Sequence, residues 1–437
     1  MVVICGNTIR VTRKNGERKT DMDKDLLIHN GLLVPMSEGL PVIPDGAVRI
    51  RENRIMDLGP AASVDASGNP KRIDAGGGII MPGFVNGHTH APMSMFRGLA
   101  DDLPLDVWLN EHIFPAEASR VTPESVTQWT VHSCREMLLA GVTTCCDGYF
   151  HEAEVARAMA GTGIRAVAGQ GVIDFPAPGV PDPLRNVDHA AAYVENARSI
   201  SSRLHPSIFC HSPYTCSADT LQAAKAAADK ARVLFQIHAA ETRNEPAMIG
   251  EGCGRSVIAY LDRLGILDRN TLLVHAVWVD DEDIEIIRQR QCGVIHCPES
   301  NMKLASGIAP VPKMIAAGIP VGLGTDGCAS NNDHDLVGEM GTAAKLHKVA
   351  CMDPCVMDAR TCLKAATIDG ARAIGMAADI GSLEPGKLAD IIIVDTHRPH
   401  MVPMHDVYSA LVYAAKSSDV SWVMVDGRIL VDAGELV

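Results

Sequence analysis

Four side chains of metal-binding type recur at the ends of short apolar runs. His88 and His90 stand two residues apart in MPGFVNGHTH, His238 closes VLFQIHA, and Asp326 lies in GTDG. Because side chains alternate along a β-strand, the two-residue spacing points both imidazoles of HTH to one face. An HxH pair alone is weak evidence, since paired histidines also occur as hydrogen-bonded polar groups. Together, three imidazoles and one carboxylate suit one Zn²⁺, with Fe²⁺ as the alternative.

Two further ionisable residues lie next to this set. Glu241 follows His238 by three residues, and His275 ends the apolar run TLLVH. A partly buried Glu has a raised pKa, which suits proton transfer, although a Glu at a helix N-terminus is the simpler interpretation. His275 is either a buried structural histidine or an acid or base beside a metal-activated water.

The elements that would position these residues form a repeated pattern. Eight apolar runs alternate with helical patterns of about 10 to 20 residues, which is typical of βα units. The runs end at His90, Gly148, Asp174, Pro213, Glu241, Trp278, Asn301 and Gly327. Eight such units predict an α/β fold with a (β/α)₈ TIM barrel over residues 81–379. Barrels of this class place their chemistry at the carboxyl ends of the strands, where the polar residues fall.

The two ends of the chain have a different pattern. Short alternating segments broken by turns, such as GAVRIRENRIMDLG and VSWVMVDGRILVDAGELV, predict β-strands at both termini. We therefore expect a small composite β-sandwich domain from residues 1–80 and 380–437. Between the first two barrel strands, residues 86–117 form a long connection that carries Trp108, and we expect a lid or a binding loop there.

Composition restricts the class of partner. The 437 residues carry a formal net charge of −14 without a run of basic residues, which argues against nucleic-acid polymers and anionic membranes. The 13 cysteines show no framework spacing, so we expect reduced thiols in a cytoplasmic protein. No apolar run reaches the roughly 18 residues of a membrane span. A small-molecule substrate fits best, and apolar accessory surfaces favour a homo-oligomer.

Four segments carry a resemblance to a known family. MPGFVNGHTH, HSPYTCS, ESNMKLASGIAPV and GTDGCASNN resemble the amidohydrolase superfamily, and within it the 5′-methylthioadenosine/S-adenosylhomocysteine deaminases. The similarity runs from about residue 25 to the C-terminus. It implies a (β/α)₈ barrel, a small composite β-domain and one Zn²⁺. The implied ligands are His88, His90, His238 and Asp326. The fourth strand contains no Lys of the kind that bridges two metals in related barrels, which also favours a single metal.

The resemblance further implies a substrate and a reaction. Glu117 would bind the ribose hydroxyls of a nucleoside, His211 would contact the nucleoside, and Ser330 would reach the purine. The reaction would be hydrolytic removal of the 6-amino group, with a metal-activated hydroxide attacking C6. Asp326 and His275 would take or steer the water's proton. Glu241 would protonate N1 and assist the departing ammonia.

One position departs from the family pattern. Members that use S-adenosylhomocysteine have an Arg at the end of the third strand for the amino-acid carboxylate, whereas this sequence has Gln170. Arg185 in APGVPDPLR is a candidate replacement. We therefore expect 5′-methylthioadenosine or adenosine to be preferred over S-adenosylhomocysteine. Trp108 either packs on the 5′ group or belongs to the core.

Two other functions compete with this interpretation. An aminohydrolase acting on a triazine, guanine or pterin ring would have the same metal ligands but no need for a ribose-binding Glu117. A barrel that has lost catalysis and serves as an assembly protein predicts eroded ligands, and none of the four is eroded.

Overall fold

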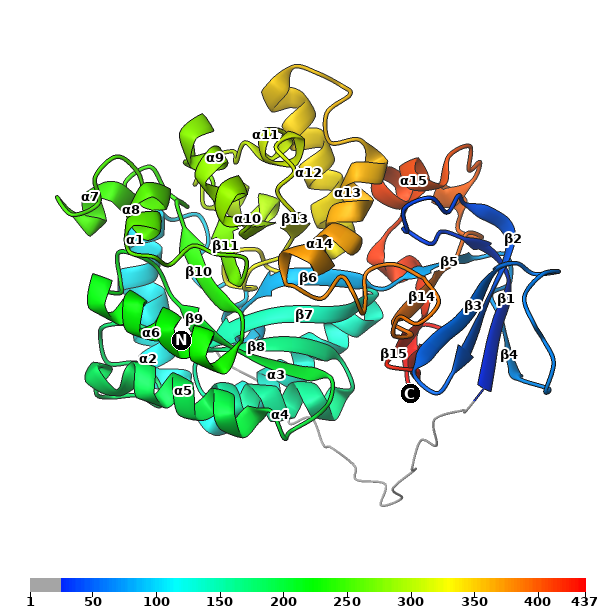
Figure 1. The fold of residues 1–437 in the computed structure, drawn as a ribbon, viewed down its shortest axis with the longest axis horizontal. Helices are drawn as coiled ribbons and strands as arrows, with labels where there is room; N and C mark the ends of the chain where they lie inside the picture. Colours follow the sequence, from blue (N-terminus) through cyan, green and yellow to red (C-terminus); the bar gives the residue numbers. More distant parts are fainter. Residues whose placement is uncertain (1–24) are drawn as a thin grey trace, which may run out of the picture.

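The computed structural model describes residues 25–437, which contain a barrel and a second sheet beside it (Figure 1). The barrel strands are β6 (Phe84–Thr89), β7 (Val142–Tyr149), β8 (Arg165–Val172), β9 (Leu204–Cys210), β10 (Phe235–Ala239), β11 (Thr271–His275), β12 (Gly293–His296) and β13 (Val321–Leu323). Each strand pairs in parallel with the next. The eight-stranded barrel expected from the sequence is confirmed.

The first and last strands meet where the candidate metal ligands lie. Thr89 forms an isolated parallel bridge with Asp326, which follows β13. A Cβ at Gly324 would lie 2.8 Å from the backbone nitrogen of His88, so glycine permits this close approach. The nearly closed barrel thereby brings the two ends of the ligand set together.

Helices cover the outside of the barrel. They are α3 (Pro123–Leu139), α4 (Glu152–Thr162), α5 (Asn186–Ala197), α6 (Ala218–Ala231), α7 (Glu245–Ile249), α8 (Val257–Arg263), α9 (Asp281–Arg290), α10 (Pro298–Lys303), α11 (Val311–Ala316), α12 (Leu336–Cys351), α13 (Ala359–Ala365) and α14 (Ile368–Ala373). Polar residues cap their N-termini: Thr122 accepts from the Ser125 N–H at α3, and Asp280 accepts from the Asp283 N–H at α9. Every residue of β7 and β8 is buried, because both faces of these strands are covered.

Strands from both termini form one mixed sheet. They are β1 (Asp25–Leu33), β2 (Ile43–Arg51), β3 (Arg54–Pro60), β4 (Lys71–Asp74), β5 (Ile79–Pro82), β14 (Ile391–Val394), β15 (Val420–Val425), β16 (Arg428–Asp432) and β17 (Glu435–Leu436). Antiparallel pairing of β5 with β14 joins the two ends. Leu26 and Ile50 from one half share a core with Trp422 and Met424 from the other.

The division into residues 1–80 with 380–437 and residues 81–379 remains our proposal, and the first 24 residues lie outside the described ones. The two parts are joined by a buried ion pair between Arg165 of β8 and Asp390, with Nε–Oδ2 at 2.7 Å. A short helix, α15 (Val407–Ser409), precedes β15.

The long connection after β6 is mostly helical rather than an open loop. It contains a 3₁₀ turn at Ala91–Phe96, α1 (Leu105–Val107), a π-helical turn at Trp108–Ile113 and α2 (Phe114–Arg120). We call residues 105–117 the lid segment, because they line the cavity described below.

The described residues bear on two further expectations. None of their helices is long and apolar enough to cross a membrane. The cysteines among residues 25–437 are all free thiols, most of them buried.

Candidate metal centre and its cavity

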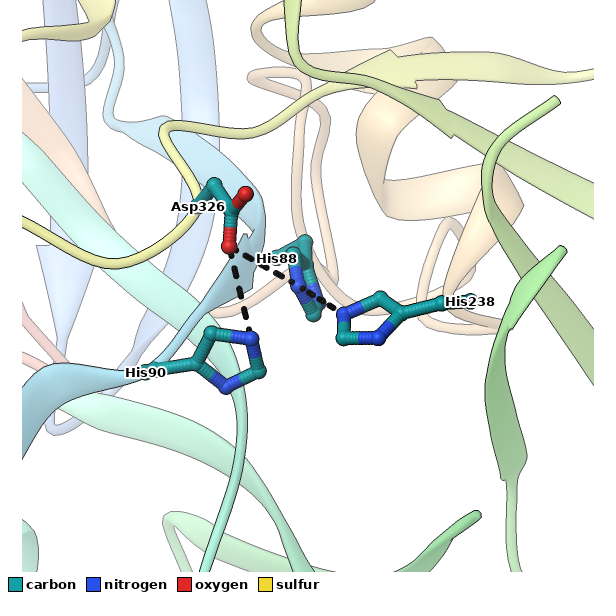
Figure 2. A group of neighbouring side chains, drawn as sticks. All are labelled: His88, His90, His238 and Asp326. Atoms are coloured by element: carbon teal, nitrogen blue, oxygen red, sulfur yellow. Dashed lines mark hydrogen bonds and ion pairs between the residues drawn. The ribbon is translucent and has the colours of Figure 1, made fainter. Parts of the chain in front are cut away.

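The four predicted metal ligands converge on one point (Figure 2). Their ligand atoms all lie within 4.8 Å of one another. The Nε2 atoms of His88 and His238 are 3.1 Å apart. Asp326 Oδ1 lies 3.3 Å from His90 Nε2 and 3.5 Å from His88 Nε2. These side chains come from the ends of β6 and β10 and from the residues that follow β13. This is the carboxyl end of the barrel strands, where the sequence predicted them.

The protonation of this group fits a metal ion. His90 Nδ1 lies 2.5 Å from the carbonyl oxygen of Gly148, so Nδ1 carries the hydrogen and Nε2 presents a lone pair to the group. Burial lowers the pKa of His88 to about 4 and that of His238 well below its usual value, which keeps both imidazoles neutral. Burial opposes ionisation of Asp326, but the hydrogen bond with His88 holds its pKa well below the usual range. Three neutral imidazoles and one carboxylate are a donor set for a divalent transition metal.

Asp326 is held in one orientation. Its Oδ2 accepts hydrogen bonds from Ser300 at 2.7 Å and from Ser330 at 3.1 Å, and its Oδ1 accepts from the Gly327 N–H at 2.8 Å. Asp326 also has a left-handed backbone, with φ +62°. This strain is typical of a residue whose side chain is fixed for function. Ser330, expected to reach the purine, therefore also orients the metal-facing carboxylate.

Glu241 and His275 lie beside the metal group as expected. His275 Nε2 is 3.9 Å from Glu241 Oε2, and both residues are buried. His275 Nδ1 lies 2.9 Å from Asn301 Oδ1, so with Nδ1 as the donor Nε2 is free to accept a proton. Burial raises the pKa of Glu241, while His275 opposes the shift. Because both side chains line the cavity, the pair can exchange protons with a substrate bound there.

Glu117 and His211 also line this cavity. Tyr149 donates to Glu117 Oε1 at 2.6 Å. Burial raises the pKa of Glu117 to about 7, although the hydrogen bond from Tyr149 lowers it. Burial lowers the pKa of His211 to about 3, and its Nδ1 lies 3.0 Å from Thr215 Oγ1. His211 is therefore neutral and can accept or donate one hydrogen bond.

The cavity combines a largely apolar lining with a few convergent polar side chains, as small-molecule sites do. Most of its wall is aliphatic and aromatic. This wall includes Leu105, Trp108, Leu109, Ile113, Phe114, Phe150, Val172, Phe209 and Leu304. Trp108 is 7% exposed and belongs to both the cavity wall and the core, so the two interpretations of it are compatible.

Tyr149 and Tyr214 line the cavity and were not singled out from the sequence. Tyr149 directly follows the apolar run that ends at Gly148, and Tyr214 lies within the HSPYTCS segment. The strand-end position that identified the ligands would have identified Tyr149 as well.

Two residues expected to contact the substrate lie elsewhere. Gln170 faces the helices outside β8: its Oε1 accepts from the Glu152 N–H at 3.2 Å, and it lines a separate cleft beside α4 and α5. The next residue, Gly171, faces the cavity, because side chains alternate along the strand. Arg185 is exposed, lies 3.3 Å from Asp188 Oδ2, and is absent from the cavity lining. Gln170 therefore cannot contact a substrate carboxylate in this cavity, and the expectation that it decides carboxylate binding is wrong.

Comparisons with known proteins agree with this arrangement. Residues 79–430 match the amidohydrolase family. A 5-methylthioadenosine/S-adenosylhomocysteine deaminase of Syntrophobacter fumaroxidans is 44% identical, over 94% of each chain. A 5′-deoxyadenosine deaminase of Methanothermobacter thermautotrophicus is 41% identical, over 90% of each chain.

Solved structures give the same result. A zinc-bound adenosine deaminase from Xanthomonas campestris matches with a TM-score of 0.92 at 37% identity, over 94% of each chain. A guanine deaminase from E. coli matches with a TM-score of 0.82 at 21% identity, over 94% of this chain and 99% of that one, which shows a shared fold alone. With a family match across most of its length and relatives above 40% identity, this chain belongs to the amidohydrolase family.

Proposed function

We propose that this protein is a hydrolytic deaminase of adenosine-type nucleosides, converting them to the inosine analogue and ammonia. The observation that carries the proposal is a single cavity lined by three members of the His₃Asp group (His90, His238 and Asp326), by the buried pair Glu241 and His275, and by the buried Glu117. Relatives above 40% identity are named deaminases of 5-methylthioadenosine, S-adenosylhomocysteine and 5′-deoxyadenosine.

The metal would be held by His88, His90, His238 and Asp326. We propose Zn²⁺, because the adenosine deaminase structure from Xanthomonas campestris carries zinc and the donor set suits it. When bound, a divalent metal lowers the pKa of water and so supplies a nucleophile at neutral pH.

The chain's own residues would carry the protons. Glu241, whose pKa is raised by burial, would donate to N1 of the purine as the water oxygen bonds to C6. His275 has an accepting Nε2 when Nδ1 donates to Asn301, and with Asp326 it would take the proton of the water. The proton taken by His275 and Asp326 would then pass to the 6-amino group, so that the C6–N bond breaks and ammonia leaves. The hydroxyl group now on C6 would return a proton to Glu241 as its oxygen becomes the carbonyl oxygen of the product.

Glu117 and the apolar wall would select the rest of the nucleoside. As a carboxylate, Glu117 can accept hydrogen bonds from the ribose hydroxyls while Tyr149 holds its Oε1. Among the described residues that line the cavity, none is a Lys or Arg. A 5′-methylthio or 5′-hydroxyl group therefore fits better than the charged amino acid of S-adenosylhomocysteine. We therefore still expect 5′-methylthioadenosine or adenosine to be preferred over S-adenosylhomocysteine. The reason is the absence of Lys and Arg from the described cavity lining, not the presence of Gln170.

Two further proposals concern the protein's cellular location and its oligomeric state. A cytoplasmic location is supported by the free cysteines among residues 25–437. A homo-oligomer remains our proposal from the apolar accessory surfaces. Analytical ultracentrifugation at micromolar concentration would test it, and a purely monomeric species would refute it.

Ammonia release tests the proposed function against its rivals. We expect the purified, zinc-loaded protein to release ammonia from 5′-methylthioadenosine and adenosine. The kcat/KM for each of these nucleosides should be at least about 100-fold higher than that for guanine or an aminotriazine. A preference for a free base or a triazine would assign the chain to the rival aminohydrolases. No release from any compound would favour the non-catalytic assembly protein.

A further inference from the structure

A buried carboxyl behind the metal group has no part in the reaction described above. Asp147 lies in β7, is fully buried, and is paired in register with Thr89, the residue between the two histidines of β6. Asp147 is not among the residues that line the cavity, so its carboxyl group does not contact a substrate bound there. Its role must therefore be exerted through its neighbours.

The hydrogen bonds of Asp147 bracket His90. Its Oδ1 accepts from the Thr89 hydroxyl at 2.6 Å and from the Ala91 N–H at 2.6 Å. The next residue, Gly148, accepts from His90 Nδ1 through its carbonyl oxygen. Consecutive residues of β7 thus fix the backbone on both sides of His90 and the orientation of its ring.

The backbone of Asp147 also reaches a second ligand strand. Its carbonyl oxygen accepts from Gln236 Nε2 at 3.1 Å, and Gln236 stands two residues before His238 in β10. Asp147 is therefore connected to the strands that carry three of the four ligands.

We propose that Asp147 is a positioning residue that holds His90 in its metal-binding orientation. This inference rests on the metal site of the proposed function. Replacing Asp147 with an apolar residue would leave the Thr89 hydroxyl and the Ala91 N–H without their acceptor in the core, and the segment from Thr89 to Ala91 would lose the contact that fixes it. Removing a residue that orients a metal-binding histidine typically weakens metal affinity 10- to 100-fold, and we expect a loss of about that size here.

The experiment measures Zn²⁺ affinity by competition with a chromophoric chelator, on the full chain stripped of metal. Asp147→Ala should bind Zn²⁺ about 10- to 100-fold more weakly than the unmodified protein. Asp147→Asn keeps an acceptor oxygen and should stay within about threefold of it. Failure of the unmodified protein to bind Zn²⁺ would count against the metal site itself, whereas equal binding by Asp147→Ala would overturn only the positioning role.

A matched control separates positioning from general destabilisation. Glu152 is another fully buried carboxyl, five residues further on, and the structure gives its side chain no hydrogen bond to residues 88–91. Glu152→Gln should leave Zn²⁺ affinity within about threefold, whatever its effect on the melting temperature of the metal-free protein. A loss as large as that of Asp147→Ala would overturn the proposal.

A second variant keeps the test decisive if Asp147→Ala does not fold. Thr89→Val removes one of the two hydrogen bonds to Oδ1 with little change in shape, and should weaken Zn²⁺ binding by about threefold or more. If Asp147→Ala folds, adding Thr89→Val to it should have almost no further effect, because the interaction is already lost. Full affinity in Thr89→Val, or independent losses in the double variant, would contradict the positioning role.

Discussion

Most side chains of the site are oriented by a particular neighbour. Gly148 fixes the ring of His90, Asn301 fixes that of His275, and two serines hold Asp326. Glu241 has no such strong partner: Ser306 lies 3.5 Å from its Oε1. Its carboxyl group is therefore the least constrained of the set and the best suited to move a proton.

Glu241→Gln tests that role. The amide keeps the size of the side chain but cannot donate a carboxyl proton, so turnover should fall by roughly 100-fold or more. Zinc content should stay at the level of the unmodified protein, because Glu241 is not one of the four ligands. Near-normal turnover would assign Glu241 to a structural role at the turn before α7.

The ionisation of Glu117 predicts a pH dependence. Its pKa of about 7 means that the carboxyl group is protonated below that pH and ionised above it. If the carboxylate accepts the ribose hydroxyls, kcat/KM for adenosine should fall as pH decreases below about 7. Glu117→Gln should have a lower kcat/KM and lack this limb. An unchanged acidic limb in Glu117→Gln would assign the titration to another group.

Period-two alternation explains which site residues could be predicted. It placed His88 and His90 on one face without further information. It also puts Gln170 on the outer face of β8, but the sequence does not reveal which face of that strand is the outer one. The resemblance to the family pattern therefore selected a residue that points away from the cavity. Asn301 of α10 and Asp147 of β7 act through contacts with other elements of the fold, which no local pattern records.

At the scale of elements, we propose that the lid segment selects which substrates the cavity accepts. Its residues form much of the apolar wall, and Trp108 packs into the core as well. The sequence indicated a lid or binding loop from the length of the connection, but not its helical turns, because tertiary packing rather than a strong helical period stabilises such short elements.

Trp108→Leu tests whether this wall binds substrate. KM for 5′-methylthioadenosine should rise about 10-fold, with kcat within about threefold, since Trp108 transfers no proton in the proposed reaction. Trp422→Leu is the control, because Trp422 is equally buried but belongs to the core of the terminal sheet. It should lower the melting temperature without changing KM. An equal rise in KM in both variants would refute a binding role for Trp108.

The charge of the lining predicts the preference for the 5′ group. A carboxylate that loses a charge-assisted hydrogen bond loses about 1.5 to 3 kcal/mol, which corresponds to roughly 10- to 100-fold. We expect kcat/KM for 5′-methylthioadenosine to exceed that for S-adenosylhomocysteine by about this factor. The reverse order would mean that a cation from outside the described lining, such as Arg185, reaches the substrate carboxylate.

At the scale of the whole molecule, the fold was the most predictable feature. Eight apolar runs in sequence order specified the barrel, because parallel strands buried on both faces leave an unmistakable pattern. The terminal sheet was predicted as a composite, but the pairing of β5 with β14 depends on contacts between residues some 310 positions apart. The near closure of the barrel brings the residues after β13 back to β6, and so places Asp326 beside His88 and His90.

The central claim is that one metal, held by four residues of a nearly closed barrel, supports deamination of an adenosine-type nucleoside. The most direct test adds Zn²⁺ stepwise to the metal-free protein and follows ammonia release from 5′-methylthioadenosine together with bound zinc. We predict that the rate rises linearly and reaches its plateau at one zinc per chain. A plateau at two zinc ions per chain, or no ammonia release at saturating zinc, would contradict this account.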